Sequence, residues 1–299
     1  MSIRAAAYAL FVICAVAEAA AAEKLKVVAT FSILGDITSR IGGDAIDLKT
    51  LVGPDGDAHV YQATAADARA VARARVVVVN GLAFDDWAYR LLRASGSKAD
   101  FVVASSDVKP HHGHDDHAGH DESTDPHAWQ DVRNAIAYTG NIERALAVAD
   151  PSNAPVYQAN AAAYRAELQT LDAEIRAALV VIPPLRRRAV TAHGSFAYFA
   201  AAYDVTLTSP LGVSTEEQAS AKSLARLITG IRQTGTSALF LENAADPRLM
   251  RQVAHETGVA LGGTLYADAL STKDGPAPTY IALMRHNLKV LTGAMAQGF

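Results

Sequence analysis

The sequence predicts an α/β protein of two lobes, each with a mainly parallel sheet flanked by helices, joined by one long rigid helix. Short β-branched runs alternate with longer amphipathic stretches on both sides of one unusually long helical pattern. Strands such as Val76 to Val79 are apolar throughout, which is typical of strands buried on both faces of a parallel sheet. No close internal sequence repeat relates the lobes, so any kinship between them would be structural only.

Residues 1–22 have the features of a cleavable signal peptide for export to the periplasm. Arg4 provides a positive start, a short apolar run follows, and Ala20 to Ala22 form a small-residue cleavage site. The bulky Ile13 stands before Cys14 where a lipoprotein signal needs a small residue, which favours a soluble product over a lipid-anchored one. Cleavage after Ala22 removes the only cysteine, so a metal site in the mature chain must use nitrogen and oxygen ligands.

The N-terminal lobe is expected over residues 23–150 and begins with a βαβαβα pattern. The expected strands are 26–31, 47–52 and 75–81, and the expected helices are 33–43, 63–74 and 84–96. A parallel sheet covered by helices on both faces follows from this order.

The linker helix is expected over residues 151–182, where Ser152 or Asn153 can cap its start and Pro183 and Pro184 end it. One stripe of this helix is apolar along its whole length: Tyr157, Ala161, Tyr164, Leu168, Leu171, Ile175 and Ala178. At 1.5 Å per residue the helix is roughly 40 Å long, so it is expected to act as a stiff spacer and not as a flexible hinge.

The C-terminal lobe is expected over residues 183–299, where the alternation resumes. The expected strands are 187–194, 204–209, 237–243 and 258–266, and the expected helices are 216–235, 246–258 and 279–296. After the signal peptide, the sequence contains no run of about 18 apolar residues, so no membrane span is predicted. The formal charge of −4 is small and unpatterned, which argues against a nucleic-acid partner.

Four metal-ligand candidates lie where α/β folds place their ligands, at the ends of strands or on adjoining loops: His59, His127, His193 and Asp268. Two come from each lobe and could converge between the lobes, where three imidazoles and one carboxylate would complete a tetrahedral zinc shell. Spacing alone carries little weight, because ligands this far apart have no diagnostic interval. His255 and His286 fall within polar helices and are expected to be solvated helix histidines.

Several motifs together resemble a known family of metal carriers. The segments "DAHVYQAT", "DPHAWQD", "TAHGSFAYFAAAYD" and "LYADALS", with a histidine-rich run before "DPHAW" and the long middle helix, are similar to the ABC-transporter solute-binding proteins for zinc and manganese. This is the ZnuA/TroA-like cluster A-I group, and the likeness is greatest to its AztC branch. The resemblance implies that His59, His127, His193 and Asp268 are the ligands, and that His193 favours zinc because manganese relatives usually carry a carboxylate there.

The first motif departs from the commoner family pattern. Ala58 replaces the usual proline before His59, and Gln62 replaces the usual glutamate after the tyrosine. Neither change removes a ligand, although the groups around His59 become harder to assign. Ligand histidines usually donate their second ring nitrogen to a carboxylate or carbonyl. The candidate acceptors, among which the sequence does not choose, are Asp57, Asp125, Asp131 and Glu242.

Residues 109–125 form a histidine-rich loop with almost nothing apolar to bury. Its candidate auxiliary metal ligands are His111, His112, His114, His117 and His120. The loop is expected to be mobile and to capture zinc weakly, because each ligand must be ordered at the moment of binding. The alternatives are a soluble loop without a required role and an unrelated contact.

The resemblance implies a monomeric periplasmic receptor, without catalytic residues, that captures Zn²⁺ between its lobes and delivers it to an inner-membrane ABC permease. A periplasmic zinc metallochaperone is a further candidate partner. One alternative is a receptor for manganese or another divalent metal. The other is a zinc hydrolase, which would need an open coordination position and a general base, and no "HExxH" helix or nucleophile elbow is present.

Overall fold

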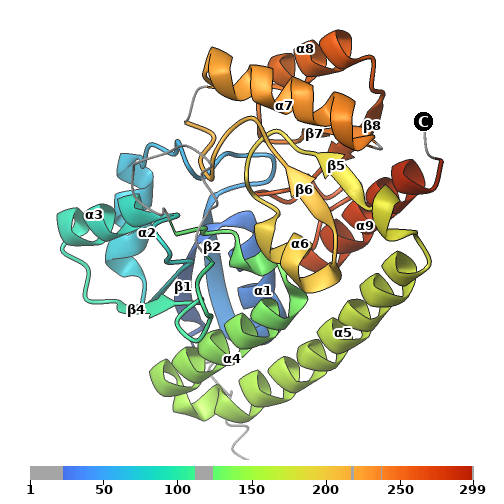
Figure 1. Cartoon of the computed structure of the whole chain (residues 1–299). Helices are drawn as coiled ribbons and strands as arrows, with labels where there is room; N and C mark the ends of the chain where they lie inside the picture. The colour runs from blue at the N-terminus through green and yellow to red at the C-terminus, as the bar shows by residue number, and fades with distance from the viewer. Residues whose placement is uncertain (1–22, 112–123, 217–218, 237, 298–299) are drawn as a thin grey trace, which may run out of the picture.

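Two parallel four-stranded sheets form the framework of the computed structural model (Figure 1). The structure describes residues 23–111, 124–216, 219–236 and 238–297. The first sheet has the order β2-β1-β3-β4 and contains β1 (Leu25–Phe31), β2 (Ile46–Val52), β3 (Val76–Val79) and β4 (Asp100–Val103). The second sheet has the equivalent order β6-β5-β7-β8 and contains β5 (Arg188–Val190), β6 (Thr206–Thr208), β7 (Ala238–Glu242) and β8 (Leu261–Leu265).

The shared strand order places a topological switch point at the same position in each sheet. In the first sheet the chain passes from β1 to β2 on one side and then to β3 on the other side. In the second sheet β5 is flanked by β6 and β7 in the same way. Ligands of open α/β sheets bind beyond the carboxyl ends of the strands at such points. The two lobes are therefore related in topology although their sequences show no repeat, and the predicted fold class is confirmed.

Helices cover the first sheet: α1 (Ser32–Gly42), α2 (Ala65–Arg73), α3 (Asp86–Ser95) and α4 (Val132–Ala149). All four valines of β3 are buried, as expected for a central strand. Thr64 and Asp67 form a reciprocal capping box at the start of α2, and the Asp131 side chain accepts a hydrogen bond from the Arg133 N–H at the start of α4.

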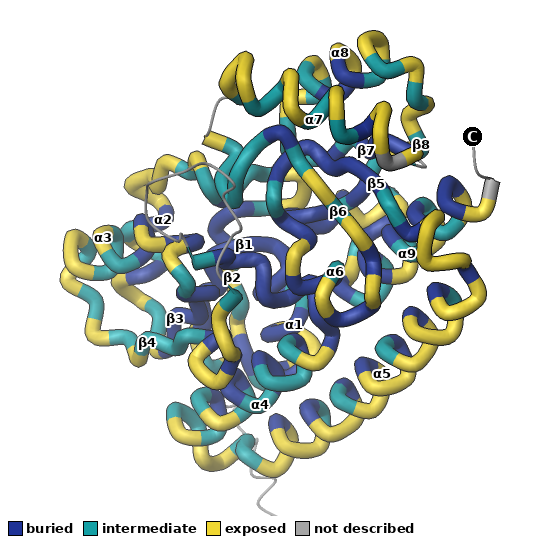
Figure 2. Tube along the Cα trace, viewed as in Figure 1, coloured by how far each residue is buried: buried dark blue, intermediate teal, exposed yellow. Residues whose placement is uncertain are grey.

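The long helix α5 (Ala154–Val180) follows a single 3₁₀ turn, Pro151–Asn153. It packs along α4 and α1 and also contacts α9, so it lies against both parts of the molecule. Its buried stripe is visible as alternating buried and exposed segments in Figure 2. The predicted stripe is correct from Tyr157 to Ile175 but wrong at its last member, because Leu179 is buried and Ala178 is only half-buried. The predicted lobe boundaries at 150 and 183 stay predictions.

The second sheet is covered by α6 (Ala197–Tyr203), α7 (Ala221–Thr234), α8 (Pro247–Thr257) and α9 (Tyr280–Gln297). A small core of six buried apolar residues lies between this sheet and α7 and α8. Strand β4 and helix α6 were not predicted, because both are short and their apolar runs have no clear period. None of the described helices is long and apolar enough to cross a membrane.

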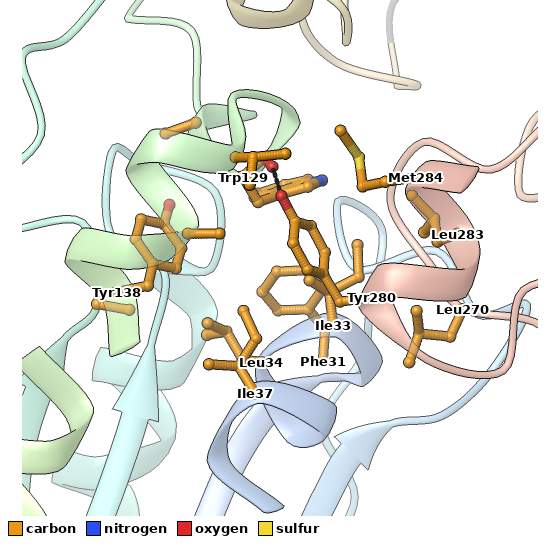
Figure 3. Close-up of a cluster of buried hydrophobic side chains, with 14 of the residues drawn as sticks. Phe31, Ile33, Leu34, Ile37, Trp129, Tyr138, Leu270, Tyr280, Leu283 and Met284 are labelled. Atoms are coloured by element: carbon orange, nitrogen blue, oxygen red, sulfur yellow. Dashed lines mark hydrogen bonds between the residues drawn. The ribbon is translucent and has the colours of Figure 1, made fainter. Parts of the chain in front are cut away.

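A continuous hydrophobic core joins the two halves next to α1 (Figure 3). Tyr280, at the start of α9, donates its hydroxyl hydrogen to the Trp129 carbonyl oxygen at 2.6 Å, and its backbone N–H donates to Asp36 of α1 at 2.8 Å. The Leu270 N–H donates to the Ser32 hydroxyl at 2.9 Å. These buried contacts fix how the loops after the two sheets face each other.

Candidate metal centre

The four predicted ligands converge in the structure. His59 follows β2, His127 follows β4 and precedes the 3₁₀ turn Ala128–Gln130, His193 follows β5, and Asp268 follows β8. One ligand atom from each of the four lies within 4.8 Å of all the others. The sequence analysis placed these residues at strand ends or on adjoining loops, and the facing of the two sheets brings these positions together.

Four of the separations between ligand atoms lie between 3.1 and 3.6 Å, close to the edges of a tetrahedral site. Nε2 of His127 lies 3.3 Å from Nε2 of His59 and 3.3 Å from Oδ1 of Asp268. Oδ2 of Asp268 lies 3.1 Å from Nε2 of His193 and 3.6 Å from Nε2 of His59. A tetrahedron with metal–ligand bonds of about 2.0 to 2.2 Å has edges of roughly 3.3 to 3.6 Å. With all four ligand atoms within 4.8 Å of one another, the set has the size of a site for one ion.

The Asp268 carboxylate has no conventional donor for either oxygen. Both oxygens are buried and lack a hydrogen-bond partner in the described structure, and so does Nε2 of His193. The Asp268 side chain is 1% exposed, so water does not solvate its charge freely. Burying an unpaired carboxylate is strongly unfavourable unless a cation compensates it. The site is thus built for a positive charge located between the three imidazoles and this carboxylate.

Two of the four candidate carboxylates, Asp125 and Glu242, lie within hydrogen-bond distance of a ligand histidine ring. Nδ1 of His127 lies 2.7 Å from Oδ1 of Asp125, and Nδ1 of His193 lies 2.5 Å from Oε2 of Glu242. Each carboxylate also accepts a hydrogen bond from the backbone N–H of its histidine. These contacts hold Nδ1 as the protonated nitrogen, so Nε2 is free to bind metal.

The other two candidates have different roles. Asp57 accepts a hydrogen bond from the His59 backbone N–H at 2.9 Å, not from its ring. Its second carboxylate oxygen accepts from the Thr215 hydroxyl at 2.7 Å, which links the His59 loop to the C-terminal half. Asp131 caps α4 and pairs with Arg133, so it does not orient a ligand.

The surroundings of His59 are mainly aromatic. Its ring lies 4.7 Å from the Phe84 ring, at an interplanar angle of 79°. Trp87 donates its indole N–H to the Ala58 carbonyl oxygen at 3.1 Å, which fixes the backbone just before the ligand. The His59 side chain is 7% exposed, compared with 0% for His127 and 1% for His193. His59 is therefore the ligand nearest to solvent.

The Asp268 loop is held from the N-terminal half. The Trp129 indole N–H and the Gln130 side-chain amide both donate to the Ala267 carbonyl oxygen, each at 2.9 Å. Neither role was predicted from sequence, and the adjacency of both residues to His127 in "DPHAWQD" is the only signal that points to them.

The charges of the site shift two pKa values strongly. Burial by itself lowers the pKa of His193, but the Glu242 and Asp268 carboxylates raise it well above its usual value. Burial by itself raises the pKa of Asp268, but the neighbouring His193 and His127 imidazoles lower it well below its usual value. Both shifts favour a protonated His193 beside an ionised Asp268, so a proton competes with a cation for this site.

The histidine-rich loop is described only at its ends, and His112, His114, His117 and His120 lie outside the described residues. His111 is described and is held in place. Its backbone N–H donates to the Tyr198 hydroxyl at 3.0 Å, and its ring lies 4.3 Å from the Tyr198 ring. Its carbonyl oxygen accepts from the Asp125 N–H at 2.9 Å, so the two ends of the loop meet beside the partner of His127.

The two helix histidines differ from each other. His255 is exposed on α8, as predicted. His286 is half-buried on α9, where Nε2 lies 3.0 Å from the Thr264 carbonyl oxygen and the ring packs against Tyr266. The prediction of a simple solvated histidine is therefore wrong for His286, because β8 and the residue after it pack directly against α9.

Comparison with known proteins is consistent across sequence and structure. Residues 27–294 match the family described as ZnuA, zinc-uptake complex component A periplasmic. The iron ABC transporter substrate-binding lipoprotein MtsA of Streptococcus pyogenes is 33% identical over 286 residues, which cover 93% of this chain and 91% of that protein.

Solved structures agree with the sequence comparison. The Mn-bound periplasmic metal-binding protein of Candidatus Liberibacter asiaticus has a TM-score of 0.82 at 30% identity, covering 91% of this chain and 100% of that one. The periplasmic zinc-binding protein TroA of Treponema pallidum has a TM-score of 0.84 at 27% identity, covering 91% of this chain and 99% of that one.

Proposed function

Because the chain belongs to the ZnuA family of periplasmic, divalent-metal-binding components of ABC transporters, we propose that its cargo is Zn²⁺, bound by His59, His127, His193 and Asp268. Members of this family are solute-binding proteins and not enzymes, so the metal is carried and takes no part in catalysis. The observation that carries the proposal is the buried Asp268 carboxylate, whose two oxygens face three imidazole nitrogens and no other partner in the described structure.

The ligand chemistry supports zinc over manganese. Three neutral imidazoles and one carboxylate suit Zn²⁺ in tetrahedral geometry, whereas Mn²⁺ prefers octahedral oxygen ligands. The fixed tautomers of His127 and His193 present Nε2 to the ion in the manner usual for zinc sites.

Manganese is the second candidate, and a specific observation favours it. The solved structures named above include one described as Mn-bound at 30% identity, whereas the TroA structure described as zinc-binding is 27% identical. Because the Asp268 carboxylate can offer both oxygens, a rearranged site can reach five ligands, which moves it closer to what Mn²⁺ prefers.

The remaining parts of the proposal concern the route of the metal. We propose that residues 1–22 are a cleavable signal peptide, that the mature chain is a monomer, and that it docks on an inner-membrane permease when loaded. The histidine-rich loop would assist zinc acquisition, either from solution or from a periplasmic metallochaperone. His111 is then better regarded as the anchor of that loop, because Tyr198 and Asp125 already occupy its backbone and ring.

Zinc titration of the mature protein against a chelator of known affinity tests the proposal. Wild-type protein should bind one tight Zn²⁺ and compete poorly for Mn²⁺, and both Asp268→Ala and His193→Ala should lose the tight site. His255→Ala is the matched control, because this histidine is exposed on α8 and does not belong to the group of four described ligands.

Deletion of residues 112–120 should leave the tight site and remove only weaker binding. Tight zinc binding by the double variant of His193 and Asp268 would reject the site, and preferential Mn²⁺ binding by the wild type would reject zinc as the cargo.

A further inference from the structure

An unusual left-handed turn connects β3 to α3 beside the metal site. Three consecutive residues, Gly81, Leu82 and Ala83, have positive φ angles of 81°, 53° and 62°. Glycine is required at the first position, because a Cβ there would lie 2.5 Å from a methyl carbon of Val103. Leu82 and Ala83 carry a Cβ that crowds the following carbonyl oxygen in this conformation, so each is strained. Strain of this kind persists only where surrounding contacts enforce it, and it concentrates at functional sites.

The buried carboxylate of Asp85 enforces the turn. Its Oδ2 accepts from the Asn80 N–H at 2.7 Å and from the Thr30 hydroxyl at 2.6 Å, and its Oδ1 accepts from the Gly81 N–H at 3.1 Å. Asp85 is fully buried, so these charge-assisted bonds are shielded from water. None of the four proposed ligands contacts Asp85 through a hydrogen bond in the described structure, so its role is to fix the backbone.

The turn delivers Phe84 to the N-terminal side of the site. The Phe84 ring is 3% exposed and lies 4.7 Å from the His59 ring and 6.0 Å from the His127 ring. Phe31 and Trp129 support it from behind, each with a ring centroid 4.9 Å away. Phe31 and Trp129 belong to the buried cluster shown in Figure 3. Phe84 is thus a buried ring that packs against two of the four ligands on one side and against the aromatic core on the other.

The same turn also fixes the approach to His127. The Asn80 side-chain amide donates to the Pro126 carbonyl oxygen at 2.9 Å, and the Tyr138 hydroxyl donates to the Asn80 side-chain oxygen at 2.6 Å. All these groups are buried. Asn80 therefore ties the beginning of the turn to the peptide that precedes His127, while Phe84 at its end contacts both His127 and His59.

We infer that Phe84, presented by this strained turn, is a positioning and specificity residue that keeps the bound metal four-coordinate. The inference rests on the proposed function and deepens it. The ring occupies the space beside His59 and His127, so a water molecule cannot approach the ion from that side as a fifth ligand. Zn²⁺ is satisfied by four ligands, whereas Mn²⁺ prefers six. The ring therefore disfavours Mn²⁺ without contacting the metal.

Substitution of Phe84 by leucine tests this inference with the full mature chain. Phe84→Leu keeps the position apolar and removes the flat ring, so a water can reach the ion. Co²⁺ serves as the spectroscopic probe, because a four-coordinate cobalt site absorbs visible light much more strongly than a six-coordinate one. The wild type should show the strong four-coordinate bands, and Phe84→Leu should show weak bands. Zinc affinity should fall roughly 10- to 100-fold, as it does when groups supporting metal ligands are lost, while Mn²⁺ affinity is kept or rises.

A matched control uses an aromatic pair formed between β4 and α3. Phe101, on β4, packs against Tyr89 at 4.4 Å and contacts none of the four proposed ligands through its ring. Phe101→Leu should keep the zinc affinity and the cobalt spectrum of the wild type, which separates loss of an aromatic ring from loss of this ring. Asp85→Asn offers a second route, because it weakens the turn without touching the site, and it should shift the cobalt spectrum in the same direction as Phe84→Leu.

Different results would reject the proposed zinc-binding function and the proposed role of Phe84. A wild-type protein that binds neither Zn²⁺ nor Co²⁺ would reject the proposed function, and the inference with it. A wild type that binds both metals, together with a Phe84→Leu variant of unchanged zinc affinity and unchanged cobalt bands, would overturn the inference alone. Circular dichroism of the metal-free variants confirms that each compared protein is folded.

Discussion

The C-terminal half of the molecule surrounds one ligand imidazole, that of His193, with two carboxylates, whereas the N-terminal half surrounds two imidazoles with aromatic rings. Glu242 and Asp268 lie 2.5 Å and 3.1 Å from the ring nitrogens of His193. His59 and His127 instead share contacts with Phe84, and His127 also packs against Trp129 at 5.3 Å. The C-terminal half supplies two of the three carboxylates that lie against the ligand rings, Glu242 and Asp268, whereas Asp125 is the third. The comparison teaches that the C-terminal half contributes more of the negative charge, while the aromatic rings of the N-terminal half shape the space around the ion.

The largest expected effect comes from removing the C-terminal charge. Asp268→Asn retains the size of the side chain but removes the carboxylate that faces all three imidazoles. Zinc affinity should fall by more than the roughly 10- to 100-fold typical of losing a supporting group, because a ligand itself is weakened. Competition titration with a chelator measures this loss. An affinity within tenfold of the wild type would contradict the division of roles.

A pair of variants compares the carboxylates that contact Nδ1 of a ligand histidine, Glu242 in the C-terminal half and Asp125 in the N-terminal half. Glu242→Gln and Asp125→Asn each weaken the contact with a ligand ring, at His193 and His127 respectively. Both should reduce zinc affinity roughly 10- to 100-fold. Glu242→Gln should cost more, because Glu242 also contributes to the charge around His193. Isothermal titration of the two variants measures the loss of zinc affinity in each. A larger loss for Asp125→Asn would contradict the greater share of charge assigned to the C-terminal half.

Proton competition should come from the C-terminal half. The pKa of His193 is raised well above its usual value by Glu242 and Asp268, against the lowering effect of burial. The metal-free protein therefore binds a proton that zinc must displace, so zinc affinity falls as pH falls. The decline should begin above pH of about 6.5, the ordinary imidazole value. Affinity measured at several pH values checks the slope, which Glu242→Gln should flatten. A constant affinity between pH of about 6 and 8 would contradict the shift.

The smallest effect on zinc affinity is expected at Asp36 of α1, whose carboxylate accepts a hydrogen bond from the Tyr280 N–H of the C-terminal half. Burial raises the pKa of Asp36 to about 6, above the value of about 3.9 for an unfolded chain. The folded state then binds this proton more tightly than the unfolded state, so the stability that Asp36 contributes is fully present below pH of about 3.9 and is lost as pH rises to about 6.

Asp36→Asn should keep the hydrogen bond from the Tyr280 N–H and remove this pH dependence. The free energy of unfolding should therefore vary less between pH of about 4 and 6 in the variant than in the wild type, which denaturant titrations can measure. Zinc affinity at neutral pH should remain unchanged. A steeper pH profile in the variant would show that the sign is wrong.

The sequence predicted the fold class and the convergence of His59, His127, His193 and Asp268, because the ends of parallel strands meet at one edge of each sheet. It could not choose between Asp125 and Asp131, since both lie within four residues of His127 and only the backbone path separates them. The turn at residues 81–83 was missed for a related reason. Leu82 and Ala83 are not residues that signal a left-handed conformation, and tertiary contacts of Asp85 impose it.

Anomalous X-ray diffraction at the zinc absorption edge, from crystals of the loaded protein, tests the central claim most directly. The account predicts one strong peak about 2.0 to 2.2 Å from Nε2 of His59, His127 and His193 and from an oxygen of Asp268, with no water as a fifth ligand. A principal peak elsewhere in the protein, or one at this site without Asp268 among its ligands, would contradict it.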